Sequence, residues 1–269
     1  MKFIFPSKYC AISLACLAVL VLGLATSASA DPIPAGWTCS GINTCGSLGA
    51  NGVVPLSPTG NSSYQFVTTA GSTATAPLPT GALGGETNGS TLATTVFSAT
   101  AGTALNFYFN YVTSDGAGFA DYAWAELYNS ANTPVSLLFT ARTEPSGSIV
   151  PGAGLPAPAA TLTPPSVPII PGGPAWSPLG GSSGACFDVG CGYTGWIGSS
   201  FIIPTAGDYY LKVGVTNWTD TLFDSGLAMD GVTVGGVPIT PPVPEPSTLL
   251  LLGSGLAGIA SSIKRRLHA

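Results

Sequence analysis

The sequence contains very little charge. Asp, Glu, Lys and Arg make up 7% of its 269 residues, whereas about 25% is usual for soluble domains. Between residues 31 and 242, Arg142 and Lys212 are the only cationic side chains. Eleven acids oppose them, and the formal charge of this region is −9. Nucleic acids and anionic lipid surfaces are bound through cationic side chains, so we expect no nucleic-acid partner.

Histidine is almost absent. The one histidine, His268, lies near the C-terminus, so residues 31–242 contain none. This absence excludes Ser-His-Asp and Cys-His catalysis and any His-ligated metal in that region. The glycines form neither a phosphate loop nor a dinucleotide fingerprint. Two facing carboxylates, as in a glycosidase, stay open as an alternative because the acids are numerous, but we expect no enzymatic activity.

Long apolar runs occur only near the two ends of the sequence. Between them, no run reaches the ~20 residues that a spanning helix needs. Near the N-terminus, Lys2 and Lys8 precede an apolar run at residues 10–24, and the small residues Ala28, Ser29 and Ala30 follow. This is the order of a secretory signal peptide. We therefore predict a signal peptide at 1–30 and an exported domain at 31–242, with a retained N-terminal anchor as the alternative.

Cysteine is sparse but regularly placed. Four cysteines remain beyond the predicted signal peptide, in two close pairs: Cys39 with Cys45, and Cys186 with Cys191. An exported protein meets an oxidising environment, where such pairs form disulfides. The spacing predicts two local disulfides. A zinc site is the alternative, and the lack of histidine disfavours it.

Glycine (36 residues) and proline (24 residues) are abundant, and between them lie short segments that alternate apolar and polar residues. In 105–112, the odd-numbered residues Leu105 to Tyr111 are apolar or aromatic and share one face; in 208–218, Tyr209 to Val215 do the same. Similar runs occur at 63–69, 92–99, 122–129, 135–142, 195–203 and 226–234. With turn residues between the runs, this pattern predicts an all-β, antiparallel jelly-roll-like β-sandwich of about eight strands.

Residues 144–184 interrupt the alternation and are rich in proline and glycine. We predict an extended, rigid loop that Trp176 pins to the sandwich, with disorder as the alternative.

Four aspartates occupy predicted loops: Asp115, Asp121, Asp220 and Asp224. Loop ends of a jelly roll can lie together, and carboxylate oxygens are the ligands that calcium prefers. Ordinary turn capping is the alternative for each residue. The sequence therefore offers calcium as a candidate cofactor, although no EF-hand spacing is present.

The C-terminal segment combines three features. Two prolines flank Glu245, an apolar stretch covers residues 249–263, and Lys264, Arg265 and Arg266 follow. Fifteen residues of helix span only about 22 Å of a hydrocarbon core about 30 Å thick. The stretch is therefore a poor permanent anchor but an adequate transient stop-transfer element, with the basic end on the cytoplasmic side.

Residues 243–269 closely resemble the PEP-CTERM sorting domain, in which a Pro-Glu-Pro motif precedes a short transmembrane helix and a basic end. The motif itself consists of Val243, Pro244, Glu245, Pro246 and Ser247. The resemblance implies an exosortase as partner, in a Gram-negative bacterium that makes extracellular polysaccharide, with transient anchoring in the inner membrane before the tail is removed. Residues 118–129 and 217–234 also resemble strands of exported jelly-roll modules, which implies a fold more than a function.

Together, these features predict an exported, non-enzymatic protein of the cell surface or extracellular matrix. The rival hypothesis is a carbohydrate-binding jelly-roll module that uses exposed aromatic side chains and binds extracellular polysaccharide. Aromatic side chains on the exposed face of one sheet would favour binding, and burial of all five tryptophans would favour a scaffold. The five tryptophans are Trp37, Trp124, Trp176, Trp196 and Trp218.

Overall fold

The computed structural model describes residues 32–239. The predicted signal peptide, the sorting motif Val243 to Ser247 and the basic residues Lys264 to Arg266 lie outside the described residues. Within 32–239, no helix has the length and apolar character needed to cross a membrane.

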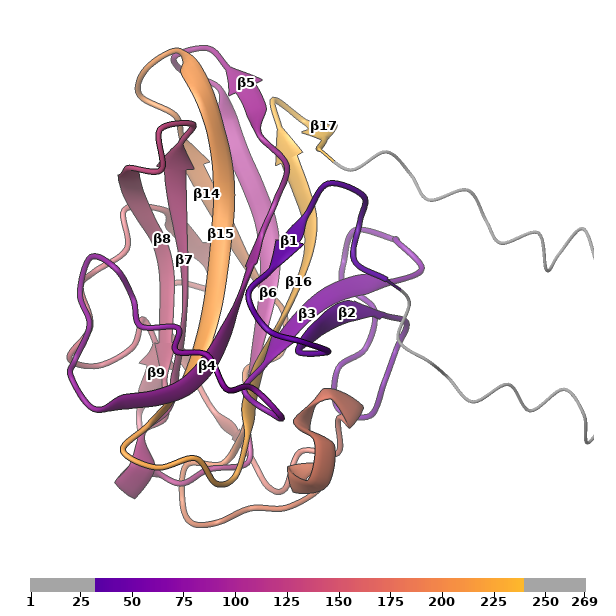
Figure 1. Ribbon diagram of the computed structural model, residues 1–269, viewed down its shortest axis with the longest axis vertical. Coiled ribbons are helices and arrows are strands. Elements are labelled where there is room, and N and C mark those ends of the chain that lie inside the picture. The colour runs from indigo at the N-terminus through magenta and orange to yellow at the C-terminus, as the bar shows by residue number, and fades with distance from the viewer. Residues whose placement is uncertain (1–31, 240–269) are drawn as a thin grey trace, which may run out of the picture.

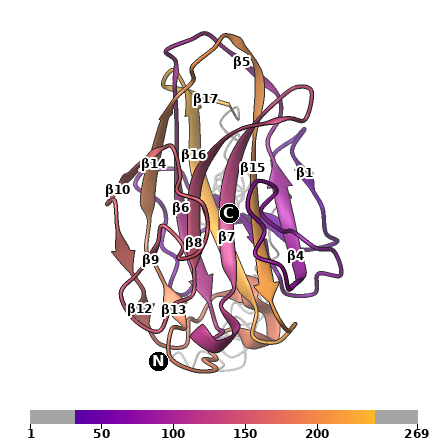
Figure 2. The same cartoon turned by 90° about the vertical axis from the view of Figure 1, so that its left-hand side faces the viewer.

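Two antiparallel sheets form a sandwich (Figures 1 and 2). Sheet I has the strand order β1-β4-β15-β7-β8, and sheet II has the order β10-β14-β6-β16-β3-β2. The long strands are β3 (Tyr64–Thr68), β4 (Glu86–Ala93), β6 (Ala104–Thr113), β7 (Tyr122–Asn129), β8 (Pro134–Arg142), β14 (Ile197–Ile202), β15 (Gly207–Trp218) and β16 (Ser225–Val234).

The connections between these long strands cross from one sheet to the other, except that β7 and β8 are consecutive neighbours in sheet I. The chain passes from β3 in sheet II to β4 in sheet I, back to β6, then through β7 and β8, and finally through β14, β15 and β16. The outcome is β14-β6-β16-β3 packed on β4-β15-β7-β8, which is the connectivity of a jelly roll. The predicted all-β sandwich is confirmed.

Shorter elements extend the sheets or lie in the connections. They are β1 (Thr38–Cys39), β2 (Cys45–Leu48), β5 (Phe97–Ala99), β9 (Ser148–Val150), β10 (Thr161–Thr163), β11 (Val167–Pro168), β12 (Ile170–Pro171), β13 (Gly192–Tyr193), β17 (Val237–Pro238) and the 3-10 helices η1 (Ala117–Phe119) and η2 (Ser177–Ser182).

The apolar faces predicted from the alternation form the core between the sheets. Leu105, Phe107, Phe109 and Tyr111 of β6 are buried there, as are the inward residues 209, 211, 213 and 215 of β15. The Phe109 ring stacks on Phe139 of β8, with 3.7 Å between centroids. Burial of these large side chains from both sheets is the main favourable contribution to folding.

One predicted strand is divided in the structure. The run at 92–99 is split between β4, which begins earlier at Glu86, and β5, which begins at Phe97. The break lies at Thr94. Its N–H donates to the carbonyl of Leu211, but the N–H of Leu211 donates to the side-chain hydroxyl of Thr94 rather than to a backbone carbonyl of this strand. The polar start of β4 is a strand because β15 pairs with it, and alternation alone does not predict that.

Residues 144–184 are ordered loop with short strands, fixed by Trp176. This side chain is 1% exposed. Its Nε1–H donates to Tyr64 Oη at 2.9 Å, and its ring meets Phe66 edge-on with 6.0 Å between centroids. A Cβ on Gly226 would lie 2.4 Å from the Trp176 ring, so the ring packs directly on bare backbone of β16.

Candidate functional site

Both local cysteine pairs are joined in the structure. The Cα atoms are 6.1 Å apart in Cys39–Cys45 and 5.6 Å apart in Cys186–Cys191, within the range of ordinary disulfides. The cysteines are therefore not zinc ligands. This finding agrees with the oxidising environment expected for an exported protein.

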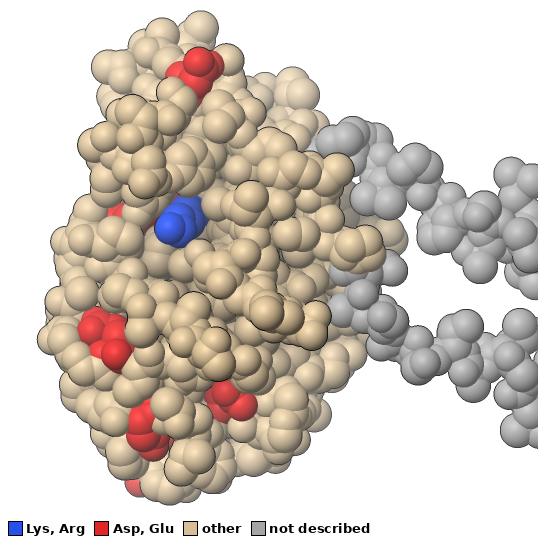
Figure 3. All heavy atoms as spheres, in the orientation of Figure 1, with Lys and Arg blue, Asp and Glu red and all other residues tan. Residues whose placement is uncertain are grey.

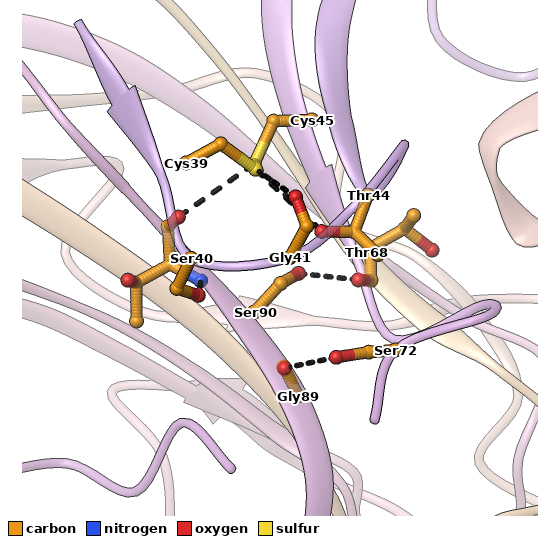
Figure 4. The surroundings of a disulfide bond; sticks show 10 residues. Cys39, Ser40, Gly41, Thr44, Cys45, Thr68, Ser72, Gly89 and Ser90 are labelled. Atoms are coloured by element: carbon orange, nitrogen blue, oxygen red, sulfur yellow. Dashed lines mark hydrogen bonds between the residues drawn. A yellow bond between two sulfur atoms is a disulfide. The ribbon is translucent and has the colours of Figure 1, made fainter. Parts of the chain in front are cut away.

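The Cys39–Cys45 disulfide connects the two sheets, although its loop is short. Cys39 belongs to β1, which pairs with β4 of sheet I, and Cys45 belongs to β2, which pairs with β3 of sheet II. Figure 4 shows hydroxyl groups around it: Ser40 accepts from the N–H of Thr91 at 2.8 Å, and Ser90 donates to the carbonyl of Thr68. The second of these hydrogen bonds also crosses between the sheets.

Three of the four predicted aspartates lie near one another at one end of the sandwich. Asp115 lies in the turn between β6 and η1, Asp121 directly before β7, and Asp220 in the turn between β15 and β16. Each of the three carboxylates is close enough to the other two to interact electrostatically. We call this region the inter-sheet polar pit and include in it Asn217 of β15 and Ser225 of β16.

Asp121 is held between the two sheets. It is completely buried. Its Oδ1 accepts from the N–H of Trp218 at 2.9 Å, and its Oδ2 accepts from Ser225 Oγ at 2.6 Å. One carboxylate thus binds a strand of sheet I and a strand of sheet II.

The electrostatics of the pit favour the uncharged form of the acids. Burial raises the pKa of Asp121 well above its ordinary value, and the nearby charges of Asp115 and Asp220 add to the effect, although the hydrogen bond from Ser225 opposes it. Burial also raises the pKa of Asp115 to about 7. The nearby charge of Asp220 contributes to this increase, whereas the hydrogen bond from the N–H of Gly116 lowers the pKa. Neighbouring like charges and a low dielectric act in the same direction here.

Asn217 is a member of the pit that the sequence did not reveal. It follows the buried residues Val213 and Val215 along β15 and directly precedes Trp218, whose N–H donates to Asp121 Oδ1. It is completely buried, and neither its Oδ1 nor its Nδ2 has a hydrogen-bond partner. Oδ2 of Asp115 is likewise buried without a partner.

Asp224 does not join the pit. Its carboxylate accepts hydrogen bonds from Thr69 Oγ1 and Ser182 Oγ, each at 3.0 Å, and burial raises its pKa. Asp224 lines a separate hollow of about 420 Å³ between β3 and η2. Across residues 32–239, no three His, Cys, Asp or Glu side chains converge to hold a metal ion by themselves.

The tryptophans form no open platform in the described part of the chain. Trp37, Trp124 and Trp176 are buried, and Trp196 and Trp218 are half-buried. Each of the half-buried pair donates its Nε1–H to a backbone carbonyl at 2.9 Å. Three of the five tryptophans are therefore buried, so the condition that all five be buried is met only in part.

A shallow groove lies on the outer face of sheet I. It has a volume of about 550 Å³ and is lined by Thr38, Ser40, Thr91, Thr94, Tyr210 and Lys212, among others. The Tyr210 ring stacks on Tyr128, with 5.2 Å between centroids, and the Lys212 ammonium lies 5.8 Å from the centre of the same Tyr128 ring. We call this feature the outer groove. Figure 3 shows how little charge one face of the molecule carries: small acidic patches and a basic patch are separated by uncharged surface.

The described domain is thus a disulfide-stapled β-sandwich of exported type. A family profile for the PEP-CTERM protein-sorting motif matches residues 242–266. The chain therefore carries a PEP-CTERM sorting motif at residues 242–266, and this motif indicates export to the cell envelope.

No curated protein matches the chain. Solved structures with a similar arrangement include TmCBM61 in complex with β-1,4-galactotriose, at 8% identity and a TM-score of 0.33, covering 74% of this chain and 88% of that one. Another is the K1 cleaved adhesin domain of Lys-gingipain from Porphyromonas gingivalis W83, at 11% identity and a TM-score of 0.35, covering 75% and 91%. A CBM4 structure has 9% identity and a TM-score of 0.29, covering 74% and 93%. Similarities at this level assign no ligand or activity to this chain.

Proposed function

We propose that this protein is a non-enzymatic structural or adhesive module of the outer surface or extracellular matrix. An exosortase delivers it by processing the PEP-CTERM tail after transient anchoring in the inner membrane. The observation that carries the proposal is the match of residues 242–266 to the sorting motif. The sandwich that precedes the tail supports it, since its tryptophans are used in packing and hydrogen bonding.

The sorting function depends on the Pro-Glu-Pro motif and is tested by replacing Glu245 with alanine. A processing enzyme needs the motif, whereas arrest in the membrane needs only the apolar stretch and the basic end. The Glu245→Ala precursor is therefore expected to accumulate in the inner membrane at full length. Cell fractionation and intact-mass measurement in a host with an exosortase make the comparison with wild type.

Thr248→Ala is the matched control, because Thr248 lies directly after the motif and before the apolar stretch. This variant should be processed like wild type. A plain membrane tether predicts that neither substitution changes mass or location. Processing would also be refuted if the mature wild-type protein at the surface kept the residues from Lys264 to Ala269.

A second function, binding of extracellular polysaccharide, is favoured by the outer groove. Its volume falls within the range of ordinary ligand sites. It offers several hydroxyl groups, one cationic side chain and the ring of Tyr210, which stacks on the buried Tyr128. Sugars are bound by such combinations, since hydroxyl groups exchange hydrogen bonds with ring substituents and aromatic faces pack against C–H groups. This function would give the scaffold a means of staying in a polysaccharide matrix.

A further inference from the structure

The inter-sheet polar pit contains more negative charge than the protein neutralises. Its carboxylates are hydrogen-bonded by neutral groups: the backbone N–H of Gly116 on Asp115, that of Trp218 and the Ser225 hydroxyl on Asp121, and the backbone N–H of Leu222 on Asp220.

The two described cations are committed elsewhere. Arg142 donates to the carbonyls of Ala120 and Ala153, and its guanidinium lies 5.0 Å from the centre of the Trp218 ring. Lys212 lies over Tyr128 on the outer face of sheet I. A buried carboxylate without a cation is costly, and it either takes up a proton or binds a metal ion.

The unpartnered atoms of the pit indicate which of the two occurs. Oδ2 of Asp115 and the whole amide of Asn217 are buried and make no hydrogen bond. Leaving a buried polar group unpaired is destabilising, and native proteins rarely leave several such groups together. A proton on one carboxylate would relieve the charge but would not occupy the amide oxygen. A cation coordinated by both residues removes the charge and satisfies the oxygens at once.

We propose that the pit binds one calcium ion through Asp115, Asp121 and Asn217, with Asp220 at its rim. All of these ligand atoms are oxygens, which suits a hard cation rather than zinc. Calcium takes six to eight oxygens in irregular geometry, whereas magnesium demands a near-ideal octahedron. Because the acids alone do not converge, the amide of Asn217 and water or backbone carbonyls complete the coordination. The free oxygen of Asp115 moves toward the ion.

The ion would join three parts of the fold. Asp115 follows β6 of sheet II, Asp121 precedes β7 of sheet I, and Asn217 belongs to β15. Calcium would therefore hold one end of the sandwich closed, as the Cys39–Cys45 disulfide does near the β1–β2 edge. An exported protein meets calcium at concentrations that can occupy such a site.

The test uses full-length protein stripped with a chelator and dialysed at pH 8. Calcium at 1 mM should raise the melting temperature by about 5 °C, given the mass-action gain at saturation and the size of the domain. Magnesium at the same concentration should produce less than half of this shift. Equilibrium dialysis with metal analysis should find one calcium ion per chain.

The variants Asp115→Asn and Asn217→Ala should bind no calcium at 1 mM and lose the shift. Asp115→Asn removes a buried charge, so it should fold at least as well as wild type without metal. Asp208→Asn is the matched control, since it removes the same charge from an exposed acid that lies in another part of the sandwich. It should keep both the stoichiometry and the shift. Absence of bound calcium in wild type, or retention of the calcium shift in both pit variants, overturns the proposal.

Discussion

At the scale of single residues, the acids of the pit make the stability of the metal-free protein depend on pH. Burial raises the pKa of Asp115 to about 7, from about 3.9 in an unfolded chain. The folded state therefore binds the proton more tightly. Stability is highest below pH 4 for this group and is lost as the pH rises from about 4 to about 7. Asp121 acts in the same direction, since burial raises its pKa as well.

The expected outcome is a lower melting temperature at pH 8 than at pH 5 when a chelator is present. The groups that face Asp115 and Asp121 are Asp220 and Tyr111, and Arg142 lies nearby on the carbonyl of Ala120. Burial raises the pKa of Tyr111 above its ordinary value of about 10, so Tyr111 stays protonated between these pH values. Thermal unfolding of wild type and Asp115→Asn at the two pH values measures the effect. An equal decrease in both proteins would show that Asp115 keeps an ordinary pKa.

The residues of the pit were only partly predictable. Asp115, Asp121 and Asp220 are recognisable because aspartate in a turn is visible in the sequence. Asn217 is not, because it lies inside a strand where its burial results from pairing with residues almost a hundred positions away. The sequence also groups Asp224 with these acids. In the structure its carboxylate instead accepts a hydrogen bond from Thr69, which is 155 residues away in the sequence.

At the scale of elements, the two disulfides have loops of similar length but different positions. Cys39–Cys45 has a sequence separation of 6 and Cys186–Cys191 one of 5. Loop-closure entropy assigns about 2 kcal/mol to either. Only the first connects a strand of sheet I to a strand of sheet II. We therefore expect the Cys39→Ser, Cys45→Ser variant to lose more stability than the Cys186→Ser, Cys191→Ser variant.

Denaturant unfolding of the two double variants measures this difference. The first should lose about 3 kcal/mol and the second about 2 kcal/mol, since the inter-sheet connection adds to the entropic effect. Equal losses would mean that the sheets at this edge are held by their other contacts, such as the hydrogen bond from Ser90 to Thr68.

The long strands were predictable and the short ones were not. Each long strand carries several alternations, so β6, β7, β8 and β15 appear in the sequence with nearly their observed bounds. Strands of two or three residues, such as β1 and β11, have no period to detect. They exist because neighbouring strands pair with them. The same reason explains the polar beginning of β4.

At the scale of the whole molecule, the strand order could not be derived from the pattern. Pairing of β3 with β16 joins Val67 to Leu227, and no local feature of either strand specifies that partner. The exported region has a large excess of negative charge: residues 31–242 have a formal charge of −9 and only two cationic side chains. Attraction to an acidic polymer through net charge is therefore excluded for this domain.

The proposed binding of polysaccharide therefore rests on hydrogen bonds and aromatic contacts at the outer groove. We expect Tyr210→Ala to weaken binding to the extracellular polysaccharide of the host at least tenfold, because the substitution removes the aromatic ring that lines the groove and stacks on Tyr128. Tyr108→Ala is the matched control, since Tyr108 lies on β6 of the other sheet and is half-buried on its outer side.

Affinity electrophoresis at 50 mM and 500 mM salt compares the three proteins. Binding to the groove should be nearly unchanged by salt, whereas binding through the charge of Lys212 alone should weaken with screening. If wild type and Tyr210→Ala migrate alike in the polysaccharide gel, the outer groove does not bind the polymer, and the protein remains a scaffold whose location depends on the sorting tail.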